Sequence, residues 1–145
     1  MRLSALCAVL SLLVVLFLIS EVTSCYVKAN GCSIPGKLPF FYKKTFINAC
    51  NKHDVCYYCG RHYKWTRYQC DKAFQGDMKK VCSNKYRKGW LRKTRRRICM
   101  KFADVYYRAV RFGGAFYFKN PTPSWCLPSC AKDRGNPTKS LSRKS

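Results

Sequence analysis

The chain has few acidic residues and almost no histidine. Six Asp and Glu stand against 29 Lys and Arg in 145 residues, so the formal net charge is +23. A positive field of this size attracts anionic membranes, sulfated glycans or nucleic acid, and charge alone selects none of them. The two histidines, His53 and His62, have no nucleophile motif beside them, which argues against a serine-type triad.

The chain also lacks internal repeats and a convincing strand pattern, apart from AFYF at 115–118. Apolar residues at helical spacing predict helices over about 40–58 and 66–82, and a third stripe runs from Phe102 to Val110. Residues 30–39, rich in Gly and Pro, should form a loop. The tail from Ala131 has no core-forming residues and is expected to be disordered. The sequence therefore predicts an all-α, disulfide-rich fold.

The N-terminus carries a largely apolar run from Leu3 to Ile19, followed by small residues up to Ser24. This pattern predicts a secretory signal peptide over 1–24. A membrane anchor is the alternative. The run is slightly short for a span, contains Ser4 and Ser11, and ends at a cleavage-like site, so we favour secretion.

The number of cysteines supports removal of the signal peptide after Ser24. Of 11 cysteines, only Cys7 leaves with the signal peptide, and ten remain. An even number is expected of a fully bridged extracellular protein, whereas a cut after Ala29 would leave nine. The ten are Cys25, Cys32, Cys50, Cys56, Cys59, Cys70, Cys82, Cys99, Cys126 and Cys130.

A basic block runs from Lys79 to Arg97, with ten basic residues and no acid. It could be a solvated loop, but its ending KTRRR is also typical of a convertase cleavage site. We expect excision of residues 83–97, which leaves an upstream chain, 25–82, and a downstream chain, 98–145. These hold seven and three cysteines, so an odd number of disulfide bonds must join them if all ten are oxidised.

The stretch CNKHDVCYYCG at 50–60 holds the most informative residues. Cys50, His53 and Tyr57 share one face of the expected helix. Cysteines and the histidine could in principle hold zinc, but paired cysteines in a secreted chain should oxidise instead.

A different chemistry uses the same stretch better. A neutral imidazole can take a proton from water when a carboxylate fixes its tautomer, and Asp54 can hold a hard cation such as Ca²⁺ through oxygen. Asp71 directly follows Cys70 at the head of the second helix. A Cys56–Cys70 bridge would pin the two helices antiparallel and bring Asp71 behind His53.

The run C-x-x-H-D-x-C-Y at 50–57, with NGC upstream and CD plus an apolar helix downstream, resembles the secreted phospholipases A2. Within them it is most similar to the conodipines, venom enzymes made as a precursor and cut into two disulfide-linked chains. The resemblance is strongest over residues 30–82. It implies a phospholipase A2-like pair of antiparallel helices with a calcium-binding loop, and a secreted, calcium-dependent hydrolase of the sn-2 ester.

The resemblance also implies roles for the catalytic residues. His53 would act as the general base, and Asp71 as the carboxylate that orients it. Tyr57 would support the pair.

The implied calcium ligands are Asp54 and loop carbonyl groups, for which Gly31 and Ser33 are the choices. The chain departs from the common enzymes at two matched positions. Ala49 replaces the first cysteine of a pair, and Asp77 stands where its partner would lie. Both halves of that bridge are absent together. The loop also lacks the glycine-rich pattern of those enzymes.

The partners implied are an anionic phospholipid surface and, as a toxin, an ion channel or receptor; nucleic acid is not expected. Trp65, Trp90 and Trp125 are candidate membrane anchors, although a tryptophan is more often simply packed. The main alternative is a non-catalytic phospholipase-like toxin, whose usual sign is loss of His53 or Asp54, and both are present. A cationic antimicrobial or glycan-binding protein would explain the charge alone.

Overall fold

The structure of the protein is a computed structural model, which describes residues 25–33, 40–118 and 121–141. The expected signal peptide, 1–24, lies outside these ranges. Within them all regular structure is helical, which confirms the all-α expectation. The helices are α2 (Lys43–Cys59), α3 (Arg67–Lys85), α4 (Arg92–Gly113), α5 (Ser129–Gly135) and the short 3₁₀ helices η2 (Gly114–Tyr117) and η3 (Ser124–Cys126). No helix of the described part is long and apolar enough to cross a membrane.

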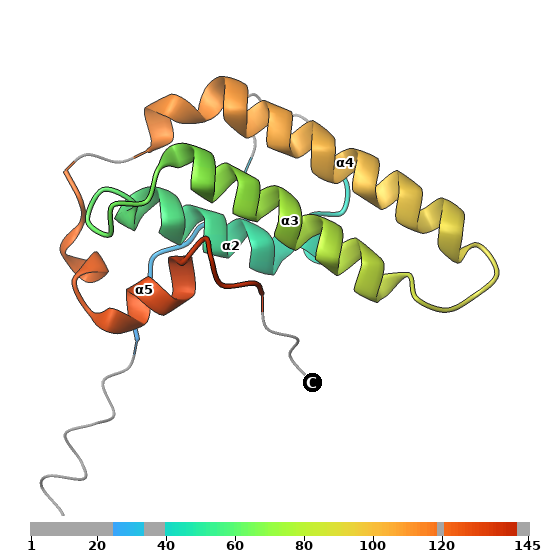
Figure 1. The fold of residues 1–145 in the computed structure, drawn as a ribbon, viewed down its shortest axis with the longest axis horizontal. Coiled ribbons are helices and arrows are strands. Elements are labelled where there is room, and N and C mark those ends of the chain that lie inside the picture. Colours follow the sequence, from blue (N-terminus) through green and yellow to red (C-terminus); the bar gives the residue numbers. More distant parts are fainter. Residues whose placement is uncertain (1–24, 34–39, 119–120, 142–145) are drawn as a thin grey trace, which may run out of the picture.

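The helices pack in the order α4, α3, α2, α5 (Figure 1). A short turn makes α2 and α3 an antiparallel pair, and the loop 86–91 folds α4 back along α3. Thr66 starts α3 with a capping box. Its side-chain oxygen accepts a hydrogen bond from the backbone nitrogen of Gln69, and the Gln69 side chain accepts one from the backbone nitrogen of Thr66. Between the three long helices lies a core that includes the fully buried Phe46 and Met78.

Five disulfide bonds use all ten cysteines of the expected mature chain. The pairs are Cys25–Cys130, Cys32–Cys50, Cys56–Cys70, Cys59–Cys126 and Cys82–Cys99. Three of them join the segment 25–82 to the segment 98–145. The expectation that an odd number of disulfide bonds joins the two segments is therefore confirmed.

Two local expectations are wrong. Residues 131–135 are not disordered, because they belong to α5, with Ala131 fully buried. Cys126 and Cys130 tether this segment to the body of the molecule, so a short helix with little apolar surface of its own can still dock. The AFYF segment is not a strand, since η2 covers residues 115–117.

The basic block is more helical than a solvated loop would be. Helix α4 already begins at Arg92, so residues 92–97 form its first turns, and 91–98 are all exposed to solvent. Only residues 86–91 form the loop between α3 and α4. Beyond the Cys82–Cys99 bridge, the block thus comprises the end of α3, this loop and the exposed first turns of α4.

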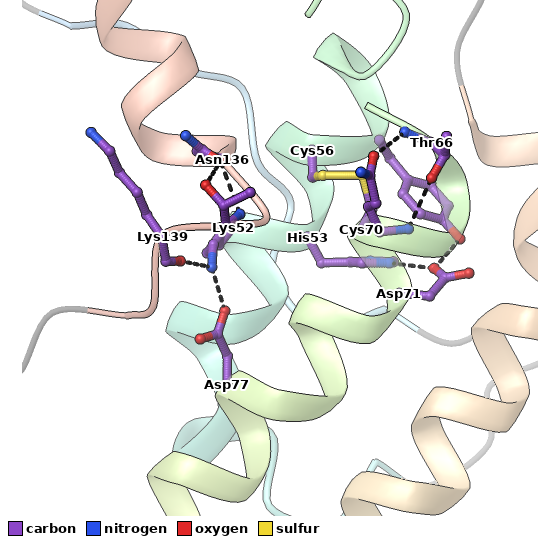
Figure 2. The surroundings of a disulfide bond; sticks show 12 residues. Lys52, His53, Cys56, Thr66, Cys70, Asp71, Asp77, Asn136 and Lys139 are labelled. Atoms are coloured by element: carbon purple, nitrogen blue, oxygen red, sulfur yellow. Dashed lines mark hydrogen bonds and ion pairs between the residues drawn. A yellow bond between two sulfur atoms is a disulfide. The ribbon is translucent and has the colours of Figure 1, made fainter. Parts of the chain in front are cut away.

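A buried ion pair replaces the disulfide bond that the resemblance would lead one to expect near Asp77. Lys52 Nζ lies 2.6 Å from Asp77 Oδ2, and it also donates to the backbone oxygen of Lys139 (Figure 2). The other carboxylate oxygen of Asp77 accepts from the backbone nitrogen of Leu141 at 3.1 Å. The pair therefore holds α2, α3 and the C-terminal segment together.

We predict that Lys52→Met destabilises the protein by about 3–5 kcal/mol, because it leaves the Asp77 carboxylate buried without its cation. The matched control is Lys79→Met. Lys79 pairs with Asp104 at 2.7 Å, but their side chains are 40% and 39% exposed, so the loss should be at most about 1 kcal/mol. Urea unfolding of both variants measures the difference, and equal losses would contradict the assignment.

Candidate active site

Two side chains from the antiparallel helices meet beside the Cys56–Cys70 bridge. His53 Nε2 on α2 lies 2.9 Å from Asp71 Oδ1 on α3 (Figure 2). The bridge joins the residue three positions after His53 to the residue just before Asp71. The juxtaposition expected from this bridge is confirmed. Tyr57, one turn further along α2, donates its hydroxyl to the same carboxylate oxygen at 2.6 Å.

Asp71 is fully buried, yet it is held ionised. Burial by itself raises the pKa of the Asp71 carboxyl. Hydrogen bonds from His53, Tyr57 and Arg111 outweigh that effect and lower the pKa below its ordinary value. Arg111 Nη1, from α4, lies 2.8 Å from Asp71 Oδ2. A negative charge is thereby fixed behind the imidazole.

His53 is buried and neutral in this environment. Desolvation lowers the pKa of its imidazole, and the hydrogen bond and charge of Asp71 oppose that shift without reversing it. Because an ionised carboxylate only accepts hydrogen bonds, Nε2 carries the proton and Nδ1 is left as the basic nitrogen. The ring stacks on Phe74 with 4.6 Å between centroids. This arrangement can accept a proton at Nδ1 and stabilise the resulting cation.

Asp54 lies on the next position of α2 and contacts the loop that precedes the helix. Its Oδ2 accepts from the backbone nitrogen of Asn30 at 3.0 Å, and the backbone of Gly31 donates to the same carboxylate. Burial raises the pKa of Asp54 to about 6. The two hydrogen bonds lower the pKa, but they offset only part of that rise. Gly31 has φ 74°, a conformation that favours glycine. The Cys32–Cys50 bridge ties this loop to α2.

A pocket of about 460 Å³ opens over these groups. Five of the six residues expected at the site line it, and the sixth, Asp71, lies behind His53. The five are Gly31, Ser33, His53, Asp54 and Tyr57. Its apolar walls come from α3, α4 and the segment before α2, and include Phe40, Phe74, Tyr106, Ala109 and Val110. The pocket suits an apolar chain with a polar end at His53 and Asp54.

The donor set for a metal is oxygen only. Among the described residues, no group of three or more His, Cys, Asp or Glu could hold an ion. One acidic residue, Asp54, lines the pocket together with Gly31 and Ser33, whose carbonyl groups are oxygen donors. Carboxylate and carbonyl oxygens suit a hard cation such as calcium, and a cation beside Asp54 would offset the desolvation that raises its pKa. The residues therefore fit calcium in chemical type.

Sequence reasoning missed two arginines that join α4 to the site. Besides the contact of Arg111 with Asp71, Arg67 Nη1 donates to the backbone oxygens of Val110 and Arg111, at 3.2 and 3.0 Å. The same nitrogen lies 3.7 Å from Asp71 Oδ2. Nothing in the sequence distinguishes these two from the other 27 basic residues.

None of the three candidate tryptophan anchors lines the pocket. Trp65 and Trp125 are partly buried against the small core around Val55. Trp90 is 94% exposed, but it lies in the loop between α3 and α4. His62, the other histidine, is exposed to solvent.

Comparisons with known proteins place the chain beside one family and several venom proteins. The profile of a family described as prokaryotic phospholipase A2 matches residues 20–114. The alpha chain of Conodipine-M from Conus magus is 39% identical over 61 residues, which cover 41% of this chain and 77% of that protein. Conodipine-P3 and Conodipine-P2 from Conus purpurascens are 46% and 44% identical over 59 residues. The match covers 41% of this chain but only 32% of each of these two relatives. No solved structure matches.

In the metal-free protein, the Asp54 carboxyl should titrate near pH 6, because its burial favours the neutral acid. Because the pKa of Asp54 is higher in the folded than in the unfolded state, its protonation stabilises the protein. This contribution is fully present below about pH 4 and is lost as the pH rises through about 6. Asp54→Asn should remove that dependence and keep an acceptor for Asn30. Carbon-detected NMR of the side-chain carboxyls measures the titration. The control is the exposed Asp133, whose pKa is lowered by its hydrogen bond from Lys139. A midpoint for Asp54 at or below 4 would contradict the burial argument.

Proposed function

The chain belongs to the phospholipase A2 family, and from this premise we propose that it is a secreted, calcium-dependent phospholipase A2 that hydrolyses the sn-2 ester of phospholipids and acts as a venom toxin. The observation that carries the proposal is the buried His53–Asp71 pair beneath an apolar pocket, with Asp54 beside it. Five disulfide bonds support an oxidising, extracellular destination.

In the proposed reaction, His53 acts as general base. Nδ1 takes a proton from a water molecule, whose oxygen attacks the ester carbonyl. Asp71 holds the ring through Nε2 and stabilises the imidazolium, while Tyr57 and Arg111 hold Asp71 in place. The imidazolium then returns its proton to the departing glycerol oxygen, so His53 ends as it began, and no acyl-enzyme forms.

Asp54 and the carbonyl groups of Gly31 and Ser33 would hold calcium, which when bound supplies positive charge for the substrate phosphate and for the developing oxyanion. The acyl chain would lie along the apolar walls, against Tyr106 and Val110 of α4. Burial there contributes about 25 cal/mol for each Å² of apolar surface removed from water.

The net charge of +23 favours a second candidate function. A cationic phospholipase-like protein can bind a channel or receptor, or disrupt anionic membranes, without hydrolysis. Intact His53, Asp54 and Asp71 in one connected site favour the enzyme. The two candidates share a membrane partner and differ in catalysis.

We further propose that residues 83–97 are excised to give two chains joined by disulfide bonds. Residues 91–97 are exposed, and the segment lies entirely between Cys82 and Cys99, whose bridge would hold both new ends. The downstream chain would still contribute Arg111 and the α4 wall of the pocket. Both chains would then be needed for one site.

His53→Gln should lower calcium-dependent fatty-acid release from phospholipid vesicles by at least about 10²-fold, because glutamine cannot act as the base. A chelator should abolish release by the parent protein. His62→Gln is the matched control, since that histidine is exposed and outside the pocket, and it should retain activity. Near-normal turnover by His53→Gln, with its fold intact by circular dichroism, would rule out His53 as the base.

Mass spectrometry of the native protein should show one species, which separates into two on reduction. Excision of residues 83–97 removes eight basic residues and no acid, so the net charge of the protein falls from +23 to +15 (23 − 8). A single intact chain after reduction would refute the processing and leave the hydrolase proposal standing.

A further inference from the structure

The C-terminal end of α4 and the following η2 expose two phenylalanines that nothing in the described structure covers. Phe112 is 96% and Phe116 91% exposed. Val105, 54% exposed, and Ala109 precede Phe112 on the same face of α4, at i−7 and i−3. Single exposed apolar residues are ordinary, but a contiguous exposed group of them indicates an interaction site.

This apolar ridge, Phe112 and Phe116, lies at the pocket. Ala109, Gly113 and Tyr117, which line the pocket, alternate along the chain with the ridge residues. The rings of Phe112 and Phe116 themselves are outside the pocket, and neither residue lines it. The ridge therefore borders the entrance through which a substrate would reach His53.

The charge around the ridge is positive. Lys101 and Arg108 are exposed at i−11 and i−4 from Phe112, on the same face of α4. No acidic residue occurs between positions 105 and 118. A second copy of a chain with net charge +23 would be repelled, whereas a surface of anionic headgroups over an apolar interior complements both the cations and the rings.

We propose that Phe112 and Phe116 insert into an anionic phospholipid bilayer and set the pocket entrance against it. The inference rests on the proposed phospholipase function, because it identifies how the same pocket meets its substrate. The rings enter the boundary between headgroups and acyl chains, and Arg108 contacts lipid phosphates. A phospholipid can then pass from the bilayer into the pocket without crossing bulk water.

Trp90 provides a matched comparison. It is as exposed as the two phenylalanines, but it lies in the loop 86–91, at the far end of the 22-residue helix α4 from η2 (Figure 1). It also falls within the segment proposed for excision. The inference therefore replaces the tryptophans with Phe112 and Phe116 as the anchors.

The test compares the double variant Phe112→Gln/Phe116→Ser with Trp90→Ser in the uncleaved, fully disulfide-bonded chain, which retains Trp90. Binding to vesicles of phosphatidylcholine with phosphatidylglycerol is measured by sedimentation in the presence of a chelator, so that hydrolysis does not intervene. Loss of two aromatic contacts should weaken binding by at least about tenfold in the double variant, and by less than about twofold in Trp90→Ser. Hydrolysis of a monomeric short-chain phospholipid with calcium should fall by less than about twofold, since the pocket is unchanged.

The outcomes separate this inference from the function on which it rests. Vesicle binding that depends on the ridge, without hydrolysis by the parent protein, would support the ridge and refute the enzyme. Unchanged binding of the double variant, equal losses in both variants, or no binding by the parent protein would each overturn the ridge. A loss of monomer hydrolysis as large as the loss of binding would show that the rings shape the pocket, and would overturn it as well.

Discussion

The buried carboxylate of Asp71 is the interaction on which the rest of the site depends. A fully buried ion must be paired and hydrogen-bonded, or its desolvation would cost several kcal/mol. Its partners come from two other helices, His53 and Tyr57 from α2 and Arg111 from α4. The same charge that orients the imidazole therefore fixes how three helices pack. The geometry of the His53–Asp71 pair and the packing of the helices therefore cannot be changed independently.

A second aspartate of α3 has a different use. Lys52 and His53 are neighbours on α2, yet they leave the helix in different directions, toward Asp77 and Asp71 respectively (Figure 2). The Lys52–Asp77 pair ties down the C-terminal segment through backbone groups, a role that a disulfide bond between two helices would not fill. An ion pair can bind three segments at once because the ammonium has three donors and the carboxylate two acceptor oxygens.

The sequence predicted the parts of the structure that depend on local pattern. Helical spacing located α2 and α3, and the positions of Cys56 and Cys70 predicted that Asp71 would lie behind His53. Arg111 could not be found in this way, because its role depends on how α4 crosses α3, and its residue type is abundant in this chain. Helix α5 was missed for a related reason. Its docking depends on disulfide partners 67 and 105 residues away, which no local pattern encodes.

The three disulfide bonds that join the two halves of the chain also bear on where the molecule can remain intact. In an oxidising fluid they persist, but in a cytosol kept reducing by cellular thiols they would open. If the basic segment has been cut out, no covalent link then retains α4, and the cationic halves repel each other. Asp71 would lose its hydrogen bond from Arg111 and, of its two arginines, keep only the more distant Arg67. A reducing cytosol would thereby separate the two chains of the cut protein without further proteolysis.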